Sequence, residues 1–398
     1  MNQLWEEKRP IPVMPDTDVL VAGGGIAGVA AALAAVRCGM RVTLMEKQVQ
    51  LGGLATIGLV NWYEPLDDGE GRQLVTGISD ELLHLSIQDG YDNLAEDWKQ
   101  GKTGDPAGPR CCTKFNPAMF TLALNELLIR EGVQLLYDIT VCEPHMNGAH
   151  CDGVITESKS GRAFYPCRML IDATGDADML CRAGVPCRSG QNYFTYYGHG
   201  VSSASLRDAL QSGDYVKLNA GGFFVGSDLT GNGHPEGMKR FSGVTVEEVS
   251  EYVTLGQLRL LEKLRTNRDL NLTALPAMAQ LRTTRCLSGT ATFDDVDGCR
   301  AAHSIGATGD FRYRKRRYEL DAGILYHDSY PNLLAAGRTV SATTGGWEVT
   351  RVIPTAALTG QAAGTLAALA IRLGCAVNQV PIDALQQHLS DAGVTLHF

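Results

Sequence analysis

The sequence predicts an α/β protein: a Rossmann-type domain with a three-stranded β-meander and an inserted α+β cap domain. Three observations lead to this prediction. An apolar strand, a glycine-rich turn and an alanine-rich helix open the chain, short alternating runs follow in its middle, and strand patterning returns near residue 281. With 398 residues, the chain is long enough for two or three domains.

The opening βαβ unit is the clearest of these patterns. Asp18–Ala22 reads as a strand, the next helix runs to about Cys38, and Gly39 ends it before a second strand at Arg41–Glu46. A helix is expected near 79–87. These lengths match a strand–helix–strand unit of about 30 residues.

The middle of the chain predicts a helix and then the meander. Asn116 is an N-cap followed by proline, so a helix is expected from Pro117 to Arg130, with a strand at Val133–Tyr137 after it. Turns at Asn147-Gly148 and Ser160-Gly161 separate three short alternating runs. The runs are 140–144, 151–158 and 162–167, and a separate strand is expected at 168–172.

The remaining residues divide between a cap and the end of the first domain. Glycine-rich loops and helices near 245–265 indicate a cap. A strand at 332–336, a small-residue helix at 355–373 and a terminal helix near 382–389 follow. We therefore expect a discontinuous nucleotide-binding domain (16–60, 110–188 and 281–373), a loop and helix insertion (61–109), a cap or substrate domain (189–280) and a helical tail (374–398).

Composition narrows the function classes. The charge sum, 35 − 44 = −9, disfavours nucleic acid and anionic membranes as partners. The 11 cysteines lack C-x2-C spacing, so no metal site is expected, and reduced thiols fit a cytoplasmic location. Met1 to Pro10 has no apolar core and predicts no secretory signal. Glycines interrupt 19–36, and Pro354 and Gln361 interrupt 352–371, so no membrane span is expected.

A dinucleotide fingerprint follows the first strand. In the motif G-x-G-x-x-G, Gly23 permits the tight turn, Gly25 lets a pyrophosphate approach the helix N-terminus, and Gly28 permits close packing. Glu46 ends the second strand 18 residues after Gly28, where a carboxylate can accept the hydroxyls of an adenosine ribose. The same charge disfavours the 2′-phosphate of NADP.

Three later features favour FAD over NAD. Gly52-Gly53 suits a chain that wraps a longer cofactor, 171–178 ends an apolar strand in a small-residue turn, and 332–337 is a similar strand end before the helix that starts near Ile353-Pro354-Thr355. The sequence Ala-Thr-Gly-Asp occurs twice, at 173–176 and at 307–310. We prefer the earlier copy because 169–171 forms a buried strand before it, whereas no such strand is expected at 303–306.

The ordered set GGGIAG, Glu46, LGG, DATGDAD, NLLAAGR and RVIPTAALTGQAAG resembles the FAD-dependent oxidoreductases of the glutathione-reductase-like fold, in particular the branch related to fumarate reductase and succinate dehydrogenase flavoproteins. The segment 281–285, followed by Gly289, is similar to the arginine motif of a large family of bacterial FAD oxidoreductases. The resemblance covers 16–60, 110–188 and 280–372. It implies a Rossmann-type FAD-binding domain, but Gly337-Arg338 replaces the Gly-Asp that holds a ribityl hydroxyl in many relatives.

Motifs and resemblance together assign a set of residues to FAD. The flavin-facing helix at Thr355 is expected to stabilise negative charge on the reduced ring through its N-terminal N–H groups. The assigned residues are Gly23, Gly25, Ile26, Ala27, Gly28, Glu46, Lys47, Gly52, Gly53, Leu54, Ala55, Val141, Ala173, Thr174, Gly175, Asp178, Gly337, Arg338, Ile353 and Thr355.

Five residues are candidates for the reaction itself. Arg282 and Arg285 have the guanidinium fork that clamps a carboxylate, or they serve in a structural ion pair or a pyrophosphate contact. Glu348 and Arg351 precede the flavin-facing helix and are expected to border the isoalloxazine. His199, in the cap, is a general base or a structural histidine.

The expected function is an FAD-dependent oxidoreductase, a dehydrogenase or oxidase that passes a hydride between flavin N5 and a small organic substrate, carboxylated or hydroxylated. No second G-x-G-x-x-G follows a strand, so electrons are expected to leave to oxygen, a quinone or a protein carrier. The alternatives are a flavin-dependent alkene reductase of the fumarate-reductase type and a non-catalytic FAD-binding partner protein. The sequence leaves the oligomeric state open.

Overall fold

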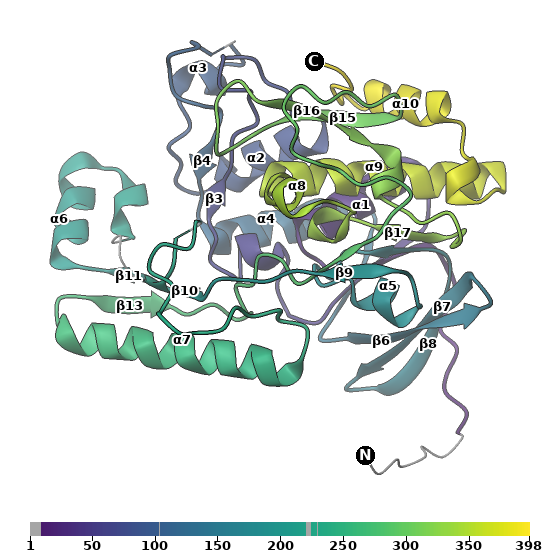
Figure 1. Cartoon of the computed structure of the whole chain (residues 1–398), viewed down its shortest axis with the longest axis horizontal. Coiled ribbons are helices and arrows are strands. Elements are labelled where there is room, and N and C mark those ends of the chain that lie inside the picture. Colours follow the sequence, from purple (N-terminus) through teal and green to yellow (C-terminus); the bar gives the residue numbers. More distant parts are fainter. Residues whose placement is uncertain (1–8, 103, 220–223, 229) are drawn as a thin grey trace.

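The centre of the molecule is a mixed sheet of seven strands (Figure 1). The computed structural model describes residues 9–102, 104–219, 224–228 and 230–398, so most of the N-terminal segment considered above lies outside it. Five strands pair in parallel, in the order β5-β2-β1-β8-β17, and β8, β7 and β6 pair antiparallel. The strands are β1 (Thr17–Ala22), β2 (Val42–Glu46), β5 (Gln134–Tyr137), β6 (Thr140–Asn147), β7 (His150–Ser158), β8 (Gly161–Asp172) and β17 (Leu333–Ala335).

Strand β8 corrects one prediction. The last run of the meander and the strand at 168–172 are one continuous strand of 12 residues. Its first half pairs antiparallel with β7, up to the pair Gly153↔Pro166, and from Cys167 onward it pairs in parallel with β1. The two predicted runs follow each other without a turn between Cys167 and Arg168. The change in their residue pattern therefore marks the point where the pairing changes from β7 to β1, and not the end of a strand. The meander is thereby attached rigidly to the parallel sheet.

Helices α1 (Ile26–Arg37) and α9 (Ile353–Leu373) pack against each other beside the sheet. A Cβ atom at Gly360 would lie 2.2 Å from the carbonyl oxygen of Ala27, and one at Gly364 would lie 2.2 Å from that of Ala31. Only hydrogen fits at these two positions, so the two backbones meet directly. Within the described ranges, α9 is also the one helix long and apolar enough for a membrane span, but 89% of its apolar window is buried inside the protein.

Further helices and a hairpin cover the same side of the core. Asn116 caps α4 through its side-chain oxygen, at 3.0 Å from the amide nitrogen of Ala118. The expectation that no buried strand precedes 307–310 was wrong, because every residue of β15 is buried and the strand pairs with β16. These elements are α2 (Ile78–Gln88), α4 (Pro117–Arg130), β15 (Ser304–Gly309), β16 (Arg317–Asp321), α8 (Thr344–Thr350) and α10 (Ile382–Asp391).

The segment predicted as a cap has a small core of its own, formed by Phe194, Tyr196, Phe241, Tyr252, Leu260 and Leu281. Its long helix, α7 (Val246–Thr266), is capped by Thr245 and lies along one side of the molecule (Figure 1). The described elements around it are β10 (Thr195–Tyr197), β11 (His199–Val201), α6 (Ser203–Ser212), β12 (Phe224–Gly226) and β13 (Asn271–Ala274). The predicted fold class, an α/β protein with a meander and an α+β cap, is confirmed.

We expect Gly364→Ala to destabilise the protein by about 1–3 kcal/mol, because the added methyl group overpacks the contact between α1 and α9. The usual effect of this change inside a helix is the opposite, a gain of about 1 kcal/mol. Urea unfolding of both proteins measures the sign directly. An equal or higher midpoint for the variant would contradict the described packing.

Candidate functional site

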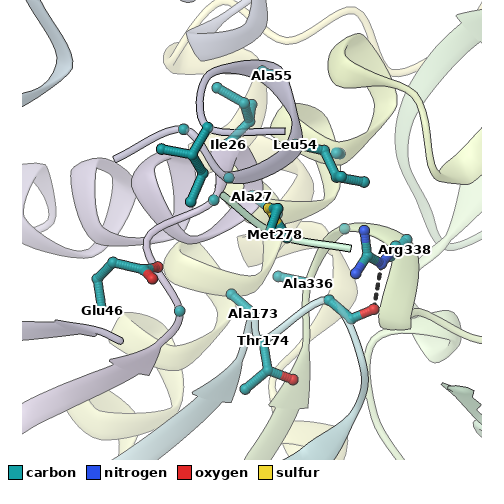
Figure 2. Close-up of a pocket in the computed structure, with 18 of the residues that line it drawn as sticks. Ile26, Ala27, Glu46, Leu54, Ala55, Ala173, Thr174, Met278, Ala336 and Arg338 are labelled. Carbon is teal, nitrogen blue, oxygen red and sulfur yellow. Dashed lines mark hydrogen bonds between the residues drawn. The ribbon is translucent and has the colours of Figure 1, made fainter. Parts of the chain in front are cut away.

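A cavity lies where β1, β2, β8 and β17 end, at the carboxyl edge of the parallel sheet, with about 760 Å³ of free space, part of it open to solvent (Figure 2). We call it the strand-end cavity. Such an edge is the usual ligand site of an open α/β sheet. Its lining residues are Gly23, Gly25, Ile26, Ala27, Glu46, Lys47, Gln48, Gly52, Gly53, Leu54, Ala55, Ile57, Ala173, Thr174, Gly175, Met278, Ala336, Gly337, Arg338, Arg351, Ile353 and Ala356.

The three fingerprint glycines have different roles. Gly23 has φ +108°, and a Cβ atom there would lie 2.4 Å from the carbonyl oxygen of Ala173. A Cβ at Gly28 would lie 1.9 Å from the carbonyl oxygen of Gly23, so both glycines are required by the chain itself. Gly25 differs, because its φ of −65° suits any residue and a Cβ there would meet no protein atom within 4 Å. The empty space at Gly25 belongs to the strand-end cavity.

Two backbone features complete the cradle around Gly25. No side chain caps α1, so the first N–H groups of this helix are available to an anion. Gly52 and Gly53 both have positive φ, and Gly52 donates its N–H to the Gly24 carbonyl at 2.8 Å. The glycine pair therefore folds back over the fingerprint turn. The resulting pocket of main-chain donors suits a pyrophosphate.

Glu46 lies on one side of this turn (Figure 2). Its carboxylate accepts hydrogen bonds from the amide nitrogens of Gly24 at 2.7 Å and Gln48 at 2.8 Å. Burial raises the pKa of Glu46, and the two N–H donors oppose that effect. The side chain is thus fixed in orientation, and its oxygens keep lone pairs for a ligand hydroxyl.

Arg338 lies on the opposite side and ties two strand ends together (Figure 2). Its guanidinium donates to the Gly175 carbonyl, and its Nη2 lies 3.0 Å from Oδ1 of Asp176. Arg285 holds the same loop, with Nε 3.0 Å from the Asp176 carbonyl and an ion pair to Asp178. Arg285 therefore engages protein groups and lines neither this cavity nor the one that contains Arg282.

A charged cluster lies at the far end of the cavity. Arg351 lines the strand-end cavity and forms an ion pair with Glu348. Glu348 and Arg282 line a second cavity, with about 1220 Å³ of free space, part of it open to solvent. Burial opposes ionisation of Glu348, but Arg351 and Arg282 lower its pKa. Burial and the charge of Arg351 lower the pKa of Arg282, and the buried Nε of Arg351 has no hydrogen-bond acceptor among the residues that the structure describes.

Glu64 is a functional candidate that sequence reasoning missed. It follows a two-residue strand, β3 (Trp62–Tyr63), and its Oε2 accepts the N–H of Ile353, the first residue of α9, at 3.1 Å. Burial raises the pKa of Glu64 to about 7, although this hydrogen bond and the charge of Arg351 lower it. A lone glutamate after an aromatic pair gives no sequence signal of this placement.

His199 has the environment of a structural histidine, the second of the two roles considered for it. Its Nε2 donates to the Leu59 carbonyl at 3.1 Å, and burial lowers its pKa. Leu59 has φ +62°, a strained value for a leucine. Gln280 donates to the neighbouring Gly58 carbonyl at 2.6 Å, and Ala277 donates to that of Ile57 at 2.9 Å. His199 lines none of the described cavities.

Sixteen of the twenty residues assigned to FAD line the strand-end cavity, and Arg351 joins them. The other four do not. Gly28 packs inside α1, the Val141 carbonyl accepts from Arg182, Asp178 pairs with Arg285, and Thr355 is buried beside Thr308. Prediction missed Gln48, Ile57, Met278, Ala336 and Ala356. Among the described residues, no three His, Cys, Asp or Glu side chains gather as metal ligands.

A family model described as FAD dependent oxidoreductase matches residues 18–232 and 294–389. No curated protein matches the sequence. Three similar solved structures have identities of 14–15% and TM-scores below 0.5. A geranylgeranyl bacteriochlorophyll reductase-like protein from Thermoplasma acidophilum has 15% identity and TM-score 0.41 (94% of this chain, 82% of that one). L-Proline dehydrogenase from P. horikoshii has 15% identity and TM-score 0.42, and the match covers 97% of this chain and 100% of that one. The anhydrotetracycline hydroxylase OxyS from Streptomyces rimosus has 14% identity and TM-score 0.43, and the match covers 95% of this chain and 66% of that one.

We expect Glu64→Gln to stabilise the protein above neutral pH. Below pH 4.5 the folded and unfolded states both hold the proton, whereas between pH 4.5 and about 7 only the folded state does, so wild-type stability falls as pH rises through this window. The raised pKa of Glu64 corresponds to ~3 kcal/mol of unfolding free energy that the wild type loses over this window. The glutamine variant does not lose it, because its side chain carries no charge at any of these pH values.

Urea unfolding at pH 5, 6, 7 and 8 measures the difference between variant and wild type. Glu126→Gln, on the exposed face of α4, serves as the control and should show no such trend. A difference that stays constant across the four pH values would show that Glu64 does not carry this proton.

Proposed function

The chain belongs to the FAD-dependent oxidoreductase family, and from that premise we propose that it oxidises a small carboxylate-bearing molecule with an FAD held in the strand-end cavity. FAD, when bound, accepts the hydride. The observation that carries the proposal is the open space above Gly25: the chain keeps a glycine where its own packing would accept a side chain. A ligand in contact with the main chain accounts for that choice.

The cavity residues match the parts of the cofactor in order. Glu46 would accept the adenosine ribose hydroxyls, and the N-terminus of α1 with Gly25 and Gly53 would receive the pyrophosphate. Arg338 stands where many relatives carry an aspartate for the ribityl chain. Because its guanidinium is bound to the loop at 175–176, we propose that Arg338 shapes this part of the cavity by holding the strand ends together.

We propose that the substrate carboxylate binds at Arg282 and Arg351, beside the flavin ring. Glu348 is held ionised and pairs with Arg351, which leaves Arg282 without an ion-pair partner among the described residues. The unpaired Nε of Arg351 supplies a donor that an anionic oxygen would satisfy. This arrangement replaces Arg285 with Arg351 as the partner of Arg282.

Within the family, we propose the branch related to fumarate reductase flavoproteins, on the strength of the ordered motifs. We also propose that the substrate is a small molecule, that the protein has no nucleic-acid partner and that it works in a reducing, cytoplasmic compartment. All 11 cysteines are unpaired, which suits reduced thiols. An anaerobic screen of hydroxy acids, amino acids and other small carboxylates tests the reaction through loss of oxidised-flavin absorbance. Reoxidation of the reduced protein by fumarate would instead assign alkene reduction.

We expect Gly25→Ala to lose FAD while keeping the fold. The methyl group meets no protein atom but enters the space of the pyrophosphate, so FAD affinity should fall at least about tenfold. FAD content per chain and the urea midpoint are measured on the same preparation. Gly28→Ala is the matched control, because its methyl group collides with the Gly23 carbonyl and should unfold the protein. A yellow, fully loaded Gly25→Ala protein would place the cofactor elsewhere.

We expect Arg282→Ala to lower kcat/KM more than about tenfold at unchanged FAD content, because it removes one partner of a charge-assisted contact. The assay uses the donor found in the screen. Arg285→Ala should behave differently and lower FAD affinity, since it frees the loop of Asp176 and Asp178. The opposite pattern, with Arg285 controlling turnover and Arg282 controlling FAD content, would reverse the two assignments.

A further inference from the structure

The second cavity contains three arginines from three separate segments: Arg188, Arg240 and Arg282. We call it the arginine cavity. Among the described lining residues Glu348 is the single acidic one, and that carboxylate is already paired with Arg351. Within the described part of the chain, none of the three arginines forms an ion pair. A protein with net charge −9 thus places three arginines without an ion-pair partner around one space.

Each of these arginines is held by neutral groups and keeps free donors. Arg240 Nη2 donates to the Tyr193 hydroxyl at 2.7 Å, and its guanidinium lies 4.3 Å from the centre of that ring. Arg188 donates to the Ala342 carbonyl, and Arg282 makes a long contact of 3.4 Å to the Asp228 carbonyl. A guanidinium has five N–H donors. Most donors of the three side chains therefore remain available to a ligand.

A buried amide brings the arginine-bearing segments together. The Asn192 side chain accepts the N–H of Arg282 at 2.7 Å and donates to the carbonyls of Phe241 and Thr283. Asn192 and Phe241 also form a backbone bridge, which places Arg240 next to the same point. All the polar capacity of this amide is used inside the protein. These hydrogen bonds therefore hold the cavity wall in place, although the positive charges of its arginines repel one another.

The arginine cavity adjoins the strand-end cavity. The Trp347 indole N–H, in the wall of the arginine cavity, donates to the Arg338 carbonyl in the wall of the other at 2.6 Å. The Glu348–Arg351 ion pair joins the two walls at a second point. A substrate held by Arg282 beside the flavin would therefore extend into the space between Arg188 and Arg240.

We propose that the arginine cavity binds a second anionic group of the substrate, so that the substrate class is a small polyanion, a polycarboxylate or a phosphorylated acid. This inference rests on the proposed function for the position of the reacting carbon. Arg282 holds the anionic group near the flavin, and Arg188 with Arg240 hold the distant one. Guanidinium forks bind carboxylate and phosphate oxygens through the same paired N–H donors.

Calorimetric titration of the FAD-loaded protein tests the cavity with three probes: citrate, inorganic pyrophosphate and acetate. We expect a polyanion to bind at least about tenfold more tightly than acetate, with weaker binding at high salt. Arg188→Gln and Arg240→Gln should each weaken polyanion binding by about tenfold and leave FAD content unchanged. Arg130→Gln, on exposed α4, is the control and should bind like wild type.

Tighter binding of citrate would assign a polycarboxylate, and tighter binding of pyrophosphate would assign a phosphorylated acid. The proposal is overturned if neither polyanion binds more tightly than acetate, or if both arginine variants bind the polyanion like wild type. Failure of the proposed function has a different signature. In that case no donor reduces the flavin in the anaerobic screen, while the titrations still show a polyanion site that depends on Arg188 and Arg240.

Discussion

The direct contact between the backbones of α1 and α9 is the constraint on which the site depends. With only hydrogen at Gly360 and Gly364, the two helices pack at the shortest distance their main chains allow. Gly337 extends this contact, because a Cβ there would lie 2.6 Å from Cβ of Ala27. The turn after β1 and the turn after β17 are thereby drawn together, although more than 300 residues separate them in sequence. One cavity forms between them, with the N-termini of both helices directed to it.

The parts of the site that could be predicted from the sequence are those in which local backbone chemistry and ligand chemistry coincide. Gly25, Glu46 and Gly53 lie in short motifs whose geometry follows from the strand and helix on either side. Met278 and Ile57 lack such a context, since they reach the cavity only through packing of the cap against the loop after Gly53. Their side chains are ordinary apolar ones, so nothing in the sequence distinguishes them from core residues.

Charged residues were the least predictable, because a charge is defined by its partner and partners come from distant segments. Arg285 and Arg282 are three positions apart, but one binds the loop at 176–178 and the other lines the arginine cavity. The sequence left His199 open between a general base and a structural histidine, and its hydrogen bond to the Leu59 carbonyl favours the structural role. Glu64 shows the converse: its chemistry comes from burial against α9, and its sequence neighbours do not indicate it.

The hydrogen bond at Leu59 is one of three that join the predicted cap segment to the strand-end cavity. Three donors from the predicted cap segment and its edge, His199, Ala277 and Gln280, hold the carbonyls of 57–59, and Ile57 among these lines the cofactor end of the cavity. These three hydrogen bonds tie the segment to the wall of the strand-end cavity and hold the left-handed peptide at Leu59 in place. The shape of that wall therefore depends on how the predicted cap segment packs against it.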